Sequence, residues 1–267
     1  MDFEYIADHV RRVRENVNDA LVRSGREGAA VNVIAVTKSA PPEVLPALFQ
    51  AGITNAAENR WQVAREKLAH PGAKQFTWHF IGSLQTNKVK YIVPRFDWIH
   101  SVDRLELAEA LSREAAKTGR TLKVLLQVNI AREPQKQGFH EEDVRRAAEL
   151  VAQLPHLELR GLMTMAPKVA HSEEARPVFR ALDELLRQVR EEMQLPAFDQ
   201  LSMGMSDDYP VAVEEGATMI RVGRQLVGSA DATQGDKTDE RTDDDCAGPV
   251  LRLLVCPAGD SARRLCT

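Results

Sequence analysis

The sequence has few of the features that mark secreted, membrane-spanning or metal-binding proteins. Its 3 cysteines form no CxxC pair and all lie close to the C-terminus, at Cys246, Cys256 and Cys266. An odd number of cysteines without a framework spacing indicates a reduced compartment rather than a disulfide scaffold. No run of about 18 apolar residues is present, so we expect no membrane-spanning helix. These absences predict a cytoplasmic protein without a metal site.

Two further classes are disfavoured by what the sequence does not contain. The formal net charge is −4, whereas a nucleic-acid-binding surface needs an excess of basic residues. The first residues, Met1-Asp2-Phe3-Glu4, lack the basic start and the apolar run of a signal peptide. We therefore expect neither nucleic acid nor a membrane as a partner.

What the sequence does contain is a long, regular alternation of apolar segments. With 43% hydrophobic and 28% charged residues, it has enough apolar side chains for a sizeable core. Apolar residues recur at steps of three and four between Ile6 and Leu21, which predicts an amphipathic N-terminal helix ending near Gly25.

After this helix, strand-like and helix-like segments alternate. The first predicted strand covers residues 31–37, and seven more end near Ala57, Gly82, Val102, Ile130, Met165, Met205 and Val222. Predicted helices cover 43–51, 60–69, 85–92, 104–118, 141–153, 173–193 and 208–215, with Asp103, Ser172 and Ser206 as expected N-caps. Short apolar strands between helices indicate a covered parallel sheet.

Eight such units predict an α/β fold, a single (β/α)8 TIM-type barrel with an extra N-terminal helix, over residues 1–228. An open doubly wound sheet is the alternative, and the absence of G-x-G-x-x-G after the first strand counts against it. Residues 229–267 are polar and acidic over much of their length, which predicts a disordered C-terminal tail.

In a barrel, functional groups lie at the C-terminal ends of the strands. Lys38 closes the first predicted strand and precedes a loop imposed by Pro41 and Pro42. A lysine that is partly desolvated at such a rim can lose its proton and attack a carbonyl carbon. A surface lysine that extends from a strand end is the alternative interpretation.

The segment 219–228 has the features of a phosphate-binding loop after an eighth strand. Gly223 allows a close approach of the backbone, and the N–H groups of Gly223 and Arg224 can point at phosphate oxygens. Arg221 lies two residues before Gly223 and therefore shares its facing. An ordinary strand-to-helix turn with a surface arginine is the alternative.

Two other segments carry polar groups near predicted strand ends. Ser202 can donate its hydroxyl to a phosphate, whereas Ser206 fits a helix cap better. In Trp78-His79-Phe80 the two flanking aromatic residues are expected in the core. His79 alternates with them as a core, solvent-facing or ligand-adjacent histidine.

Taken together, these motifs resemble the YggS/PROSC family of pyridoxal phosphate homeostasis proteins from about residue 5 to residue 228. The resemblance is carried, in order, by Ala35-Val-Thr-Lys38, Glu58-Asn59, Trp78-His-Phe-Ile-Gly-Ser-Leu-Gln-Thr-Asn-Lys88, His100-Ser-Val-Asp103, Gly161-Leu-Met-Thr-Met165, Ser202-Met-Gly-Met-Ser-Asp207 and Arg221-Val-Gly223. One departure is Ala57, where the family pattern has glycine, and the acidic tail lies outside the pattern.

The resemblance implies a fold-type III barrel like the barrel domain of alanine racemase, with pyridoxal 5′-phosphate (PLP) as cofactor. It implies that PLP is held as a reversible Schiff base on Lys38. It places Ser202 and the Gly223–Arg224 backbone at the phosphate and Arg221 beside the pyridine nitrogen. It also implies, less directly, that Asn59 and Met203 line the cofactor.

An arginine can only donate to the pyridine nitrogen, which disfavours a protonated ring and weakens it as an electron sink. We therefore predict a monomeric PLP carrier without substantial turnover, with no catalytic residues and with PLP-dependent apoenzymes as recipients. Lys88 and Lys136 are candidate amines for its release. An amino-acid racemase is the alternative function, for which Tyr209 is the tyrosine nearest the predicted site, and a cofactor-free Schiff-base aldolase is a third.

Overall fold

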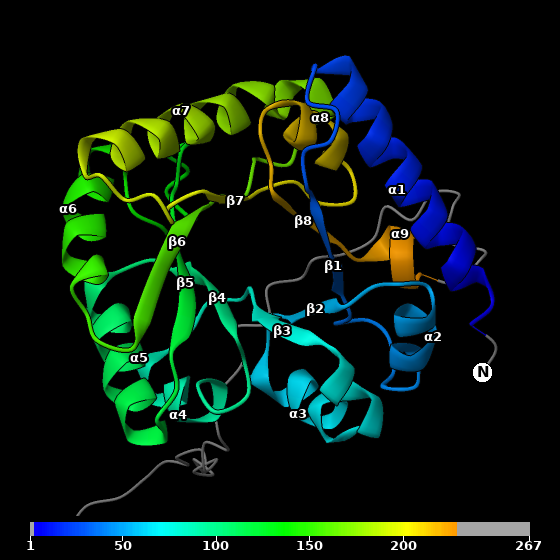
Figure 1. The fold of residues 1–267 in the computed structure, drawn as a ribbon, viewed down its shortest axis with the longest axis horizontal. Helices are drawn as coiled ribbons and strands as arrows, with labels where there is room; N and C mark the ends of the chain where they lie inside the picture. The colour runs from blue at the N-terminus through cyan, green and yellow to red at the C-terminus, as the bar shows by residue number, and fades with distance from the viewer. Residues whose placement is uncertain (1–2, 229–267) are drawn as a thin grey trace, which may run out of the picture. The chain divides into compact units, whose positions relative to one another are not determined.

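The computed structural model describes residues 3–228, which form a closed barrel of eight parallel strands. The strands neighbour one another in chain order, and β1 closes the barrel by pairing with β8. Figure 1 shows the ring of strands with the helices outside it. The strands are β1 (Asn32–Val36), β2 (Asn55–Glu58), β3 (Thr77–Phe80), β4 (Trp98–Val102), β5 (Leu122–Gln127), β6 (Leu157–Met163), β7 (Gln200–Ser202) and β8 (Met219–Val222).

The helices follow the strands in the alternation expected for a TIM-type barrel. They are α1 (Tyr5–Arg23), α2 (Val44–Gln50), α3 (Trp61–Ala69), α4 (Val89–Ile92), α5 (Leu105–Thr118), α6 (Glu141–Ala152), α7 (Arg176–Glu192), α8 (Tyr209–Glu214) and α9 (Arg224–Val227). Short 3-10 helices cover Pro71–Gln75, Thr86–Lys88 and Ser172–Ala175. The closed barrel and the extra N-terminal helix are confirmed, and the open doubly wound sheet is excluded.

The strands separate two hydrophobic layers, because successive side chains point to opposite faces of a strand. The inner layer fills the barrel and contains Ile34, Val36, Ala57, Trp98, Leu125, Met163 and Met219. The outer layer is larger and lies between the strands and the helices. Side chains of the inner layer therefore face the barrel interior, and strand side chains of the outer layer face the surrounding helices.

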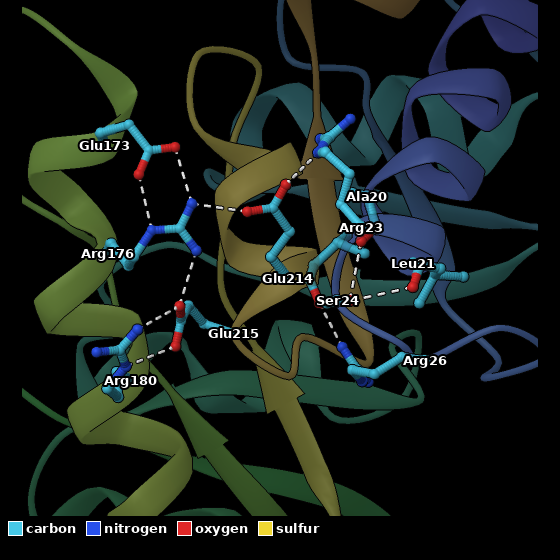
Figure 2. A network of polar contacts seen from close by, with 11 residues as sticks. Ala20, Leu21, Arg23, Ser24, Arg26, Glu173, Arg176, Arg180, Glu214 and Glu215 are labelled. Carbon is cyan, nitrogen blue, oxygen red and sulfur yellow. Dashed lines mark hydrogen bonds and ion pairs between the residues drawn. The ribbon is translucent and has the colours of Figure 1, made fainter.

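Helix α1 packs against α8 and α9 and covers the seam at which the barrel closes (Figure 1). Its predicted apolar face is buried, and Gly25 follows its end with a φ of 67°. Figure 2 shows an ion network beside this face, in which Arg23 contacts Glu214 and Arg176 bridges Glu173, Glu214 and Glu215. The network ties α1, α7 and α8 together at the surface.

The helix caps differ from the expected ones. Arg104, not Asp103, is the cap residue of α5, because the Asp103 carboxylate pairs with the Arg104 side chain at 2.6 Å. His171 forms a capping box with Glu174, which leaves Ser172 inside the following turn. Only at His171 does a neighbouring side chain take over the capping hydrogen bond, since the Arg104 side chain makes none at the start of α5.

Some predictions concern residues outside the described range. The tail at 229–267 and its three cysteines lie outside the described residues. Within residues 3–228, none of the helices combines the length and apolar character that a membrane crossing requires. The same described range holds no cluster of three or more His, Cys, Asp or Glu residues arranged for a metal ion.

Candidate functional site

The candidate site lies at the C-terminal ends of β8, β1 and β2, three neighbouring strands at the seam of the barrel. Ile34 and Val36 of β1 belong to the inner layer, and the same alternation gives Lys38 an inward facing. Lys38 lies in the turn after β1 and is exposed at the barrel mouth. The predicted position of Lys38, at the end of the first strand, is confirmed.

Behind Lys38, on the outer face of the wall, the ends of β1 and β2 are fastened to α3. The Thr37 hydroxyl donates to Glu58 Oε1 at 2.5 Å, and Lys67 of α3 lies 2.9 Å from the same oxygen. Glu58 and Lys67 are 0% and 2% exposed. Thr37, the residue before Lys38, is therefore hydrogen-bonded to a buried ion pair, which restrains the strand end from which the Lys38 amine extends.

Asn59 follows β2 and stands next to Lys38's strand, half-buried. Its backbone touches Gly82, where a Cβ atom would come within 1.9 Å of the Asn59 carbonyl oxygen. Only glycine permits this approach, so Gly82 determines how closely the loop after β3 packs on Asn59. This contact explains why a glycine follows the apolar residues of β3.

Arg221 lies inside the barrel on β8 and is 4% exposed. Its Nη1 donates to Ser202 Oγ at 2.6 Å, and its Nη2 donates to the Thr164 carbonyl oxygen at 2.9 Å. Within residues 3–228, Arg221 therefore has no carboxylate as a hydrogen-bond partner. Burial lowers the pKa of Arg221 to about 10, while the charge of Asp208 acts in the opposite direction. The guanidinium is therefore a cation at neutral pH.

A chain of buried polar side chains extends from Ser202 into the barrel, and sequence reasoning did not find it. His100 Nδ1 lies 2.8 Å from Ser202 Oγ, and His100 Nε2 lies 2.9 Å from His79 Nδ1. His79 Nε2 contacts Asn55 Oδ1 at 3.0 Å. The available signal was that both histidines alternate with apolar residues on β3 and β4, which gives them a common inward facing.

The predicted phosphate loop joins β8 to α9. Gly223 N lies 3.4 Å from Ser206 Oγ and donates to it, and the Arg224 side chain pairs with Asp207 at 2.5 Å. The Ser202 hydroxyl instead lies between His100 and Arg221, and the residue is 0% exposed. The structure therefore favours Ser206 over Ser202 as the serine beside the Gly223 N–H.

The expected helix cap at Ser206 is wrong, because α8 begins three residues later, at Tyr209. Its cap residue is Asp208, whose Oδ1 accepts from Met205 N at 2.6 Å. This arrangement leaves the Ser206 hydroxyl free of a capping role and turned toward Gly223. Ser206 thus lies where Ser202 was expected, and Ser202 instead joins Arg221 to His100.

Two other residues lie away from the barrel mouth. Met203 is fully buried in the outer layer, so its side chain packs between the strands and the helices and does not line the interior. The Tyr209 hydroxyl accepts from Asn16 Nδ2 of α1 at 2.7 Å, and Tyr209 is 1% exposed. Its ring therefore belongs to the contact between α8 and α1.

The candidate secondary amines lie in different surroundings. Lys136 donates to the Ala166 carbonyl oxygen at 3.0 Å, beyond the end of β6, and pairs with Glu133. The ammonium of Lys88 lies 6.0 Å from the centre of the Tyr91 ring, outside the barrel. Of the two, Lys136 is held near the C-terminal end of a strand.

The site therefore combines three chemical groups on neighbouring strands. Lys38 offers an exposed amine, Arg221 a buried cation, and the Gly223–Ser206 loop a backbone N–H with a hydroxyl. An amine attacks a carbonyl carbon, and a cation and an N–H group stabilise anionic oxygens. This set suits a small ligand that carries both a carbonyl group and an anionic group.

Comparisons with known proteins agree with this arrangement. The model of the alanine racemase N-terminal domain family matches residues 9–231. A pyridoxal phosphate homeostasis protein of Aquifex aeolicus is 38% identical over 221 residues, which cover 83% of this chain and 96% of the relative. The protein of the same name from Pseudomonas aeruginosa is 39% identical and covers 85% and 96% of the two chains.

Solved structures show the same similarity. PipY of Synechococcus elongatus PCC7942, solved with PLP bound, matches with a TM-score of 0.73 at 36% identity and covers 84% of this chain and all of PipY. An alanine racemase of Clostridium difficile 630 shares the fold at 14% identity and a TM-score of 0.64, over 82% of this chain and 56% of the racemase. The chain belongs to the family of pyridoxal phosphate homeostasis proteins, which is built on the alanine racemase N-terminal domain.

Proposed function

We propose that this protein binds pyridoxal 5′-phosphate at the mouth of the barrel and serves PLP homeostasis, holding the cofactor on Lys38 as a reversible Schiff base. The observation that carries the proposal is the convergence of an exposed amine and a buried cation on the paired strands β1 and β8. Family membership and the PLP found in PipY support the choice of this cofactor.

The residues present fit the cofactor's functional groups. An aldehyde reacts with an uncharged primary amine, which Lys38 offers at an accessible position. A phosphate is an acceptor for N–H and O–H donors, and Gly223 N and the Ser206 hydroxyl, 3.4 Å apart, are two donors that would bind it. Arg221 would donate to the ring nitrogen, and Asn59 would border the ring from β2. Arg224 would contribute its backbone N–H.

The absence of substantial turnover is part of the proposal. Bound PLP can act as an electron sink that stabilises carbanions, most effectively when an acid protonates its ring nitrogen. Arg221 does not transfer a proton to the ring nitrogen at neutral pH, because even after burial its pKa is about 10. Its guanidinium therefore supports retention of the cofactor more than reaction on it.

The position of the described tyrosines also favours a carrier over the racemase alternative. A two-base racemase needs a second base at the barrel mouth. Tyr209 instead packs against α1, where its hydroxyl accepts a hydrogen bond from Asn16. Tyr5 lies on α1, and Tyr91 stacks on Trp61 with ring centres 5.6 Å apart. A cofactor-free aldolase is disfavoured by the relatives' shared name.

The proposal extends to the protein's surroundings. We infer a cytoplasmic monomer of one barrel domain over residues 1–228, whose recipients are PLP-dependent apoenzymes. The amine of Lys136, held beside the end of β6, is the candidate group for displacing Lys38 during release. Replacement of one amine by another at an imine carbon needs no additional reagent.

Reductive trapping tests the proposal. Purified protein incubated with PLP should absorb as a lysine-bound adduct, and borohydride should fix the cofactor's mass on the peptide that contains Lys38. Lys38→Ala should lose this labelled peptide, whereas Lys88→Ala, which changes a lysine outside the barrel, should retain it. A protein that traps no PLP, or that traps it equally after Lys38→Ala, contradicts the proposal. Racemisation of amino acids at about 1–1000 per second would favour the racemase alternative.

A further inference from the structure

The chain of buried side chains beneath Arg221 crosses the barrel interior and is made entirely of neutral groups. It joins β8 to β7, β4, β3 and β2 through Ser202, His100, His79 and Asn55. Ser202, His100 and His79 are each at most 1% exposed. Every link is between 2.6 and 3.0 Å, so each is a hydrogen bond of normal length.

The two ends of the chain impose one direction on its hydrogen bonds. A guanidinium only donates, so Ser202 Oγ accepts from Arg221, and its own hydrogen is left for His100 Nδ1. A neutral imidazole that accepts at one nitrogen donates from the other, so His100 Nε2 donates to His79 Nδ1. His79 Nε2 then donates to Asn55 Oδ1, which can only accept.

The opposite direction leaves groups unsatisfied. If His100 Nδ1 donated to Ser202, the serine hydrogen would lack this acceptor, and His79 Nε2 would present a lone pair to the Asn55 oxygen. Unsatisfied polar groups in a dry interior cost about 1–3 kcal/mol each. The chain therefore has one favourable arrangement of its protons.

This arrangement stabilises the Arg221 cation without cancelling its charge. Each dipole in the chain turns its acceptor end toward Arg221, and the Thr164 carbonyl does the same from the other side. A carboxylate partner would form an ion pair and remove the net charge from the barrel interior. Neutral acceptors fix the guanidinium plane and leave a full positive charge at the ring position.

We infer that His79, His100 and Ser202 are positioning residues for Arg221: they take the place of a hydrogen-bonded carboxylate and hold the guanidinium as an oriented cation facing the bound cofactor. This inference rests on the proposed function for its ligand, but the hydrogen-bond direction belongs to the protein alone. The two parts can therefore be tested separately.

The first test concerns the free protein. Two-bond proton–nitrogen NMR spectra of histidine-labelled protein report which ring nitrogen carries the hydrogen. We expect both His79 and His100 to be neutral, with the hydrogen on Nε2 and an unprotonated Nδ1, at pH 7.5. A hydrogen on Nδ1 of His100, or a doubly protonated ring, would overturn the inference whatever the outcome of PLP trapping.

The second test compares two buried serines that differ in their contacts. Ser202→Ala removes one of the two acceptors of Arg221, whereas Ser101→Ala removes a neighbouring buried hydroxyl that has no partner among the described residues. We expect Ser202→Ala to weaken PLP binding about tenfold and to shift the absorption maximum of the bound cofactor and its pH profile. Ser101→Ala should match the unmodified protein in all three.

Variants at His100 separate positioning from packing. His100→Asn keeps an oxygen near the position of Nδ1 for the Ser202 hydroxyl, whereas His100→Leu removes both contacts. PLP affinity and spectrum should therefore change less for the asparagine variant than for leucine. Should Ser202→Ala and His100→Leu lower only the melting temperature, with spectrum and affinity unchanged, the residues would be structural and the inference wrong. If the unmodified protein itself traps no PLP on Lys38, the proposed function fails instead.

Discussion

Two buried cations lie on opposite faces of the barrel wall, and they are satisfied in different ways. Lys67, outside the wall, meets the carboxylate of Glu58 at 2.9 Å. Among the residues that the structure describes, Arg221, inside the wall, donates hydrogen bonds only to a hydroxyl and a carbonyl oxygen, and Asp208 acts on it through its charge alone. In the first arrangement the positive charge of Lys67 is neutralised by a carboxylate of the protein. The second leaves a positive charge for a ligand to complete, which separates a cation that serves stability from one that serves binding.

The largest loss of stability is expected from breaking the buried pair of Lys67 and Glu58. Lys67→Met should destabilise the fold by about 3–5 kcal/mol, because the Glu58 carboxylate would remain buried without its partner. Urea denaturation measures this loss. The double variant Lys67→Met/Glu58→Leu should recover most of it, since neither charge is then buried. A loss below about 1 kcal/mol in the single variant would show that the pair is not a buried ion pair in solution.

The next effect concerns the neutral histidines that serve the inner cation. Burial lowers the pKa of His79 to about 3, aided by the charge of Lys123. Burial also lowers the pKa of His100 well below its usual range, aided by His79 and Arg221. Unfolded histidines titrate near pH 6.5, so the unfolded chain binds more protons below that pH. Stability should be retained above pH 6.5 and fall toward acid by about 1.4 kcal/mol per pH unit for each histidine.

Chemical denaturation at pH 7.5, 6 and 5 measures this slope. His79→Gln/His100→Asn should reduce it, whereas His140→Gln, which changes an exposed histidine, should leave it unchanged. Equal slopes in all three proteins would mean that the buried pair does not titrate on unfolding, against the expectation.

A third cation sharpens the comparison, because it has several carboxylate partners but lies near solvent. Arg176 contacts Glu173, Glu214 and Glu215, and its side chain is 25% exposed (Figure 2). Arg176→Met should cost about 1 kcal/mol, since water and salt weaken exposed ion pairs. The cost should shrink further in about 1 M salt, where the screening length is about 3 Å. A cost as large as that of Lys67→Met would show that partner number outweighs burial.

The smallest effect on stability is expected at the inner cation. Arg221→Met removes a buried charge and leaves two acceptors unsatisfied, costs that oppose each other, so stability should change by about 1 kcal/mol or less. PLP affinity should nevertheless fall at least about tenfold, a loss of about 1.4 kcal/mol of binding free energy. Thermal denaturation and PLP titration measure the two quantities. A large loss of stability with unchanged affinity would reverse the roles assigned to the two cations.

The sequence predicted the barrel well because its signals are local. Apolar segments of strand length alternate with amphipathic helices, and each observed strand ends within about three residues of its predicted end. Lys38 was found for the same reason, since a strand end next to two prolines can be recognised without any long-range contact. Arg221 and Gly223 were found through the spacing typical of a loop after the eighth strand.

The parts that sequence reasoning missed depend on contacts between distant segments. His79 and Ser202 meet His100 from strands far apart in the chain, and nothing near His100 indicates either partner. Ser206 was assigned to a helix cap, because the local sequence does not show that α8 begins only at Tyr209, with Asp208 as its cap residue. Met203 was assigned to the site by motif, but alternation along β7 places it outside the wall.

The pairing of β1 with β8 has a consequence for the order of events during synthesis. Lys38 emerges among the first residues of the barrel, while Arg221 and Gly223 emerge with the last strand. The site straddles the seam, so a nascent chain carries the amine long before it carries the guanidinium and the loop that complete the pocket. The pairing of β1 with β8 cannot form before the last strand has been synthesised. Only a complete barrel therefore has all the groups of the proposed site. A truncated product would present Lys38 without the groups that retain a ligand.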